Sequence, residues 1–178
     1  MEVKWIFAML STFFLISTYF GYFIADLFPE LAKKQIESIQ EFLKDFASNK
    51  TSPFSIFLLI LLNNALKSFI AMLLGIFFGI VPLLFLFING AVIGILAKTI
   101  GEKIGLPVFL LLILPHGIIE IPAVILACSY GFWLGIEFLK NRKGILVKIK
   151  YTVNRFLKIV LPMLTIAALI ETALIILT

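Results

Sequence analysis

The stretch LPVFLLLILPHGIIEIPAV, residues Leu106–Val124, decides how this chain folds. An uncharged apolar run opens it, Pro115–Gly117 interrupts that run, and Glu120 follows His116 by about one helical turn. Proline lacks a backbone donor and clashes with the preceding turn, and glycine tolerates conformations that other residues avoid. We therefore expect a helix break at Pro115, Gly117 and Pro122. Because ionisable residues inside a membrane are costly, they mark functional sites. The stretch predicts a membrane protein with a polar interior site around His116 and Glu120.

The composition of the 178-residue chain supports a membrane protein. Hydrophobic residues make up 62% of it and charged residues 14%, whereas soluble domains average roughly 45–50% and about 25%. Nineteen Phe and long Leu/Ile runs favour helices over the alternating strands of a barrel. We expect one all-α transmembrane bundle forming a single domain.

Charge and cysteine content limit the classes of partner and cofactor. The net charge of +5 is concentrated in one segment, which argues against nucleic-acid binding and for a role in topology. The single Cys128 excludes an internal disulfide. One Cys and one His argue against a zinc site built within one chain, although two His and two Glu could be shared across a dimer axis. We expect no cofactor and no metal.

Five apolar segments predict five membrane spans. A hydrocarbon core of about 30 Å needs roughly 20 helical residues. The first segment lacks a small-residue cleavage site and is expected to be a retained span. The fourth is too long for one simple crossing, so a half-helix followed by a full span is expected there. The expected spans are approximately 5–25, 54–80, 83–97, 106–139 and 159–178, with an amphipathic helix over 29–47.

The segment Lys140–Lys158 predicts the orientation in the membrane. It contains several Lys and Arg and no Asp or Glu, so the positive-inside rule places this loop in the cytoplasm. Five crossings then place the N-terminus in the cytoplasm, and the C-terminus and helix 29–47 outside. A polybasic loop also attracts anionic headgroups, so membrane lipid is an expected partner.

Further polar residues interrupt the second and third spans. Asn63, Asn64 and Lys67 lie in the second span, and Asn89 lies in the third. When Asn63 is aligned with His116, Lys67 falls on Glu120, with each pair four residues apart on one helical face. We expect Lys67 and Glu120 to approach each other, because mutual burial of opposite charges lowers their cost in lipid.

Glycines spaced by four residues predict close helix packing. Such pairs open a groove that lets two helix backbones approach. Packing within the chain explains most of them, and three grooves among five helices also suggest a homodimer. The pairs are Gly75 and Gly79, Gly90 and Gly94, and Gly131 and Gly135.

Three function classes are compatible with this polar site. A buried network of His, Glu, Asn and Lys can fix one helix arrangement, as expected of a scaffold or assembly protein. A polar break near the membrane midplane is also typical of a pathway for a small solute or ion. An intramembrane metal-dependent enzyme ranks third, because catalysis needs more groups than His116 and Glu120.

The polar motifs resemble those of the stage II sporulation protein M family. The resemblance covers roughly residues 62–135 and includes Asn63-Asn64, Asn89-Gly90 and the string from Pro115 to Pro122. It implies a polytopic membrane protein. The family's namesake assembles with cell-wall hydrolases during engulfment and acts as their membrane anchor. The resemblance therefore favours a scaffold with a membrane or envelope protein as partner.

Overall fold

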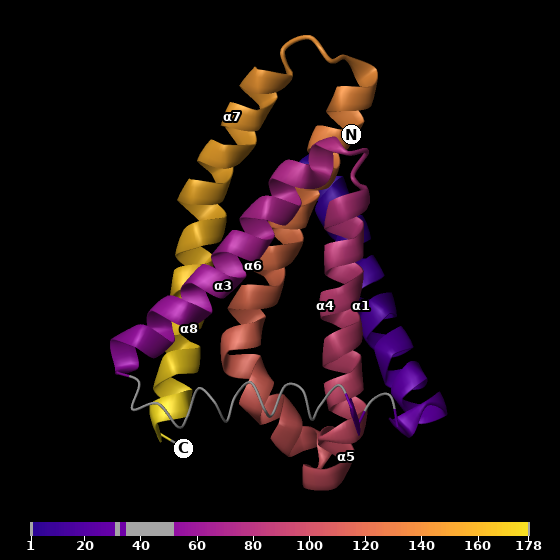
Figure 1. Ribbon diagram of the computed structural model, residues 1–178, viewed down its shortest axis with the longest axis vertical. Coiled ribbons are helices and arrows are strands. Elements are labelled where there is room, and N and C mark those ends of the chain that lie inside the picture. The colour runs from indigo at the N-terminus through magenta and orange to yellow at the C-terminus, as the bar shows by residue number, and fades with distance from the viewer. Residues whose placement is uncertain (1, 31–32, 35–51, 178) are drawn as a thin grey trace.

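The computed structural model describes residues 2–30, 33–34 and 52–177, and its secondary structure is helical (Figure 1). Five helices are long and apolar enough to cross a membrane, which confirms the predicted all-α architecture. The elements are α1 (Val3–Leu27), α3 (Pro53–Leu73), η1 (Leu74–Ile76), α4 (Ile80–Thr99), α5 (Gly101–Ile104), α6 (Leu106–Lys140), α7 (Ile145–Arg155), η2 (Phe156–Val160) and α8 (Leu161–Leu177).

A tight turn between η1 and α4 moves the expected boundary of the second and third spans. Phe78 and Gly79 have φ angles of 58° and 75°. Glycine adopts this left-handed conformation without penalty, so Gly79 can end one helix immediately before the next begins. Pro82 lies in the first turn of α4, where its missing N–H needs no intrahelical acceptor. The third span therefore starts at Ile80 instead of residue 83.

The expected break at Pro115–Gly117 is wrong, because α6 is one helix of 35 residues. Pro115 and Pro122 lie inside it. Each proline removes a single hydrogen bond, and neighbouring helices allow a transmembrane helix to continue past it. Figure 1 shows that the first part of α6 is bent relative to the remainder. The prolines thus coincide with a bent helix, which also accommodates a length of about 52 Å.

The basic segment Lys140–Lys158 is mostly helix, which corrects the expected loop. Only residues 141–144 separate α6 from α7, and α7 continues through the π-helical η2 into α8. Lys and Arg are good helix formers, so a change from apolar to basic residues does not end a helix. The predicted helix 29–47 falls almost entirely outside the described residues and stays a prediction.

Glycines bring helix backbones into contact within the chain. A Cβ atom added at Gly75 would overlap the backbone of Gly131, and one at Gly135 would overlap Gly79. A Cβ atom added at Gly90 or Gly94 would likewise overlap atoms of α1, near Ser17 and Thr18. The three predicted grooves are therefore filled by the chain's own helices, so a homodimer would need another surface.

Charged side chains form ion pairs at the two ends of the bundle. At the end formed by α4 and α5, Lys98 Nζ lies 2.6 Å from Asp26 and 2.7 Å from Glu102. At the opposite end, Glu137 pairs with Lys148 at 2.6 Å. Figure 1 shows that α1 begins at the same end as the α6–α7 connection, whereas α8 ends at the other. These ends match the predicted alternation of five crossings.

Candidate functional site

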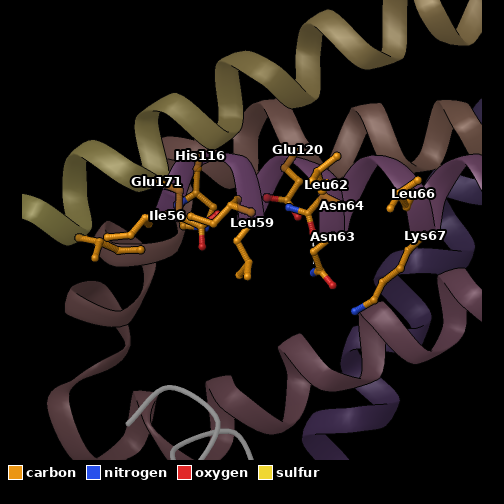
Figure 2. Close-up of a pocket in the computed structure, with 12 residues that line it drawn as sticks. Ile56, Leu59, Leu62, Asn63, Asn64, Leu66, Lys67, His116, Glu120 and Glu171 are labelled. Atoms are coloured by element: carbon orange, nitrogen blue, oxygen red, sulfur yellow. Dashed lines mark hydrogen bonds between the residues drawn. The ribbon is translucent and has the colours of Figure 1, made fainter. Parts of the chain in front are cut away.

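The candidate site lies where α3, α6 and α8 meet in the apolar part of the bundle. Figure 2 shows polar side chains from all three helices around one cavity, whose volume is about 770 Å³. At 1.5 Å per residue, His116 and Asn63 lie about 15 Å, and Glu171 about 9 Å, from the nearer ends of their helices. The polar lining consists of Asn63, Asn64, Lys67, His116, Glu120 and Glu171.

Three of these side chains form a compact cluster. His116 and Glu120 are four residues apart on α6, which places them on one helical face. Glu171 comes from α8. One ligand atom of each residue lies within 4.8 Å of one ligand atom of the other two, and all three residues are partly buried. The cluster therefore combines an imidazole and two carboxylates in mostly apolar surroundings.

The cluster differs from most buried hydroxyl groups of the spans in how it is satisfied, although Ser68 Oγ on α3 is also buried without a partner in the described chain. Ser17, Ser129 and Thr172 each donate a hydrogen bond to the carbonyl four residues earlier on the same helix. Within the described part of the chain, neither Glu120 nor Glu171 takes part in an ion pair. His116 Nδ1 is buried and has no hydrogen-bond partner there. Groups of this kind are costly in lipid unless a ligand or a proton satisfies them.

The structure brings most of the predicted site residues together. Asn63 and Asn64 line the cavity, and the side-chain amide of Asn63 donates to Asn64 Oδ1 at 3.3 Å. Lys67 lines the same cavity as Glu120, but among the described residues no ion pair joins the two side chains. Figure 2 shows the side chains of Lys67 and Glu120 as separate parts of the lining.

The structure changes the assignment of two residues, Asn89 and Glu171, relative to the site predicted from the sequence. Asn89 does not line this cavity. It lines a second one, of about 540 Å³, together with Lys67, and donates to the carbonyl of Phe85 at 2.7 Å. Glu171 was not predicted as a site residue. The sequence does contain an indication of its role, because Glu171 is a single carboxylate in the last apolar span. Ionisable residues inside a membrane usually mark functional sites.

The cluster is suited to holding a cation. The cavity lining includes no Ser, Thr or Cys of the described chain, so it offers no hydroxyl or thiol nucleophile. Imidazole nitrogen and carboxylate oxygens are common ligands of divalent metals. The sequence points to His116 and Glu120 as possible ligands within one chain but not to Glu171, whose position beside them depends on how α8 packs.

Comparison with known proteins identifies the family. Searches for similarity to curated proteins and to solved structures gave no match. The family model described as stage II sporulation protein M matches residues 10–174. This match covers nearly the whole chain and extends well beyond the motifs around His116. The chain therefore belongs to the stage II sporulation protein M family.

Proposed function

We propose that this protein binds a small cation within the membrane and provides part of a pathway for it. One observation carries the proposal: the ligand atoms of His116, Glu120 and Glu171 lie within 4.8 Å of one another inside an apolar bundle. Two neighbouring carboxylates repel each other strongly where the dielectric constant is low. A cation between them removes that repulsion and also satisfies the unpaired imidazole.

The arrangement of the two cavities supports a pathway. Lys67 lines both, so the cavity around His116 adjoins the one that contains Asn89. Asn89 lies near the middle of α4, about 14 Å from its start and about 15 Å from its end. Polar side chains thus line two adjoining cavities within the spans. Polar groups in such a series usually line the route of an ion or small solute.

Flux measurements in liposomes test this function. Purified protein is reconstituted, and uptake of Zn²⁺, Mn²⁺, K⁺ and protons is followed with entrapped dyes. We expect uptake of at least one cation above that of protein-free liposomes, and its loss in His116→Ala. Glu137→Gln is the matched control, because Glu137 is on the same helix but pairs with Lys148 at the far end. Uptake equal to that of empty liposomes for all four cations contradicts the pathway.

A scaffold is the second candidate, and one observation favours it. Asn63 and Lys67 line the cavity but are themselves exposed, within a mostly apolar span. A lysine facing lipid costs about 2.5–3.5 kcal/mol on insertion scales. A partner helix that covers this face would remove the cost, in keeping with an assembly role for the family's namesake.

Photo-crosslinking separates the two candidates. A photoreactive amino acid replaces Asn63, and Phe7 on α1 serves as the control position. A scaffold gives one discrete crosslinked partner at Asn63, lost in Lys67→Met, and no cation flux. A crosslinked species of twice the chain mass would instead support the predicted homodimer. Crosslinks to lipid alone contradict the scaffold.

A further inference from the structure

We propose that His116, Glu120 and Glu171 form a binding site for one first-row divalent transition-metal ion, for which Zn²⁺ is the probe. The inference rests on the proposed function and deepens it by naming the class of cation. Binding can be measured without flux, so the two proposals can fail separately. The site combines a helix-face pair on α6 with one carboxylate from α8.

The donor set and its spacing fit such an ion. Zinc binds His nitrogen at about 2.0–2.1 Å and carboxylate oxygen at about 2.0–2.2 Å, so its tetrahedral ligands lie roughly 3.4 Å apart. The ligand atoms here lie within 4.8 Å of one another. The side chains of Glu120 and Glu171 can change rotamer, which is the movement that binding would require to close the remaining distance. Three protein ligands leave a fourth position open for water or cargo.

Charge selects a divalent ion over a monovalent one. The three proposed ligands, two carboxylates and a neutral imidazole, carry two negative charges, which one divalent cation neutralises, whereas Lys67 lines the same cavity without an ion pair to either carboxylate among the described residues. A monovalent cation would leave a net negative charge in surroundings where an isolated charge costs about 2.5–3.5 kcal/mol or more. Neutralising both carboxylates therefore favours a divalent cation, because the site lies within the membrane-spanning part of the helices.

The buried nitrogen of His116 is an independent sign of a missing partner. Nδ1 has no hydrogen-bond partner in the described chain, although buried polar atoms are nearly always satisfied. A metal on one ring nitrogen and a bound water on the other would satisfy the ring. Figure 2 shows Asn64 next to Glu120, where its amide can hold that carboxylate or supply a further oxygen.

The same donors exclude other classes of metal. Copper(I) prefers thiolate and thioether ligands, and neither Cys nor Met of the described chain lines the cavity. Calcium and magnesium prefer oxygen ligands throughout, so an imidazole ligand disfavours them. The competing occupant is a proton shared between Glu120 and Glu171, which would also remove their repulsion.

Metal binding by the purified full chain tests the inference. Protein in mild detergent is stripped with EDTA, and Zn²⁺ binding is then measured by calorimetry and elemental analysis. We expect one Zn²⁺ per chain, and at least about 100-fold weaker binding in Glu171→Gln and Glu120→Gln, since losing even a supporting group costs about 10–100-fold. Glu137→Gln should keep wild-type affinity. Circular dichroism verifies that each variant is folded.

Cobalt(II) provides a spectroscopic readout at the same site. Bound Co²⁺ should give visible absorption bands that depend on its ligands, and Glu171→Gln should abolish them. Binding should weaken in acid, because the ligands coordinate only when deprotonated. Zn²⁺ binding that is absent, or unchanged in Glu171→Gln, overturns the inference and leaves the shared proton as the occupant. Zn²⁺ binding without flux overturns the pathway alone.

Discussion

Gly131 and Gly117 lie on the same helix but differ in what surrounds them. A Cβ at Gly131 would lie 2.8 Å from Pro82 Cγ and 2.9 Å from the backbone of Met72. A Cβ at Gly117 would meet only side-chain atoms of its own helix, at 3.4 Å or more. Gly131 therefore sets how closely α6 approaches its neighbours, whereas Gly117 does not.

This contrast gives a prediction about stability. Gly131→Ala should lower the free energy of unfolding by about 1–3 kcal/mol, as expected for overpacking against backbone. Gly117→Ala should be neutral or stabilising by up to about 1 kcal/mol, because alanine favours helix. Thermal unfolding in detergent, followed by circular dichroism, compares the two. Equal losses at both positions would contradict the packing described.

Single residues also show how far the sequence predicts the site. His116 and Glu120 could be paired from sequence because a spacing of four fixes their common face on any helix. Glu171 could not be paired with them, since its position opposite α6 depends on how α8 packs. For the same reason, the sequence could not determine whether Lys67 and Glu120, which line one cavity, would also form an ion pair. Local periodicity does not determine the register between helices.

Lys67 is nevertheless placed to act on a bound cation, because it lines the same cavity as Glu120. Removing its positive charge in Lys67→Met should tighten Zn²⁺ binding by roughly 3- to 30-fold. Lys103→Met on α5 is the control and should leave the affinity unchanged. Calorimetry measures both. Weaker binding in Lys67→Met would show that the lysine supports the site instead of competing with the ion.

Among the helices, α6 has the feature with the greatest consequence for the candidate site, which is its bend. Pro115 lies just before His116 and leaves the carbonyl of Leu111 without its helical donor. The sequence identified the positions of both prolines but overestimated their effect. Surrounding helices allow the rest of the hydrogen-bond ladder to persist, and the helix bends instead of ending.

Straightening this helix should disturb the site. Pro115→Ala restores the missing hydrogen bond, so we expect an unchanged or higher melting temperature together with about 10-fold weaker Zn²⁺ binding. Pro107→Ala is the matched control, because Pro107 lies in the first turn of α6, where no intrahelical bond is lost. Equal Zn²⁺ affinity in wild type and Pro115→Ala would show that the bend does not shape the site.

For the whole molecule, we propose an orientation in the membrane from the distribution of charge. The basic residues of α7 lie at the end of the bundle where α6 connects to α7. Two aromatic residues, Trp133 and Tyr151, lie nearby, with their ring centroids 5.8 Å apart. Basic and aromatic side chains typically gather at a membrane surface, and the basic side is cytoplasmic. We infer that the His116 cluster lies nearer the outer surface.

Cysteine labelling checks this orientation. Cys128 is fully buried, so Cys128→Ala gives a cysteine-free background. In intact cells, a membrane-impermeant maleimide should label Lys103→Cys on α5 and not Asn141→Cys in the α6–α7 connection. Permeabilised cells should label both. The reverse pattern in intact cells would place the His116 cluster nearer the cytoplasm.

The overall architecture was the most predictable part of the molecule. Apolar runs of spanning length define a transmembrane helix by composition alone, which is why five spans were identified. The four-residue glycine spacing likewise indicated close packing, but not which helices meet. Contacts between distant segments, including the junction of α3, α6 and α8, depend on packing that no single segment encodes.

The most direct measurement is anomalous X-ray diffraction at the zinc absorption edge, from crystals of the full chain grown with Zn²⁺. We expect one strong anomalous peak per chain, about 2.0–2.2 Å from ligand atoms of His116, Glu120 and Glu171. A peak only at exposed carboxylates, or no peak where α3, α6 and α8 meet, would contradict it.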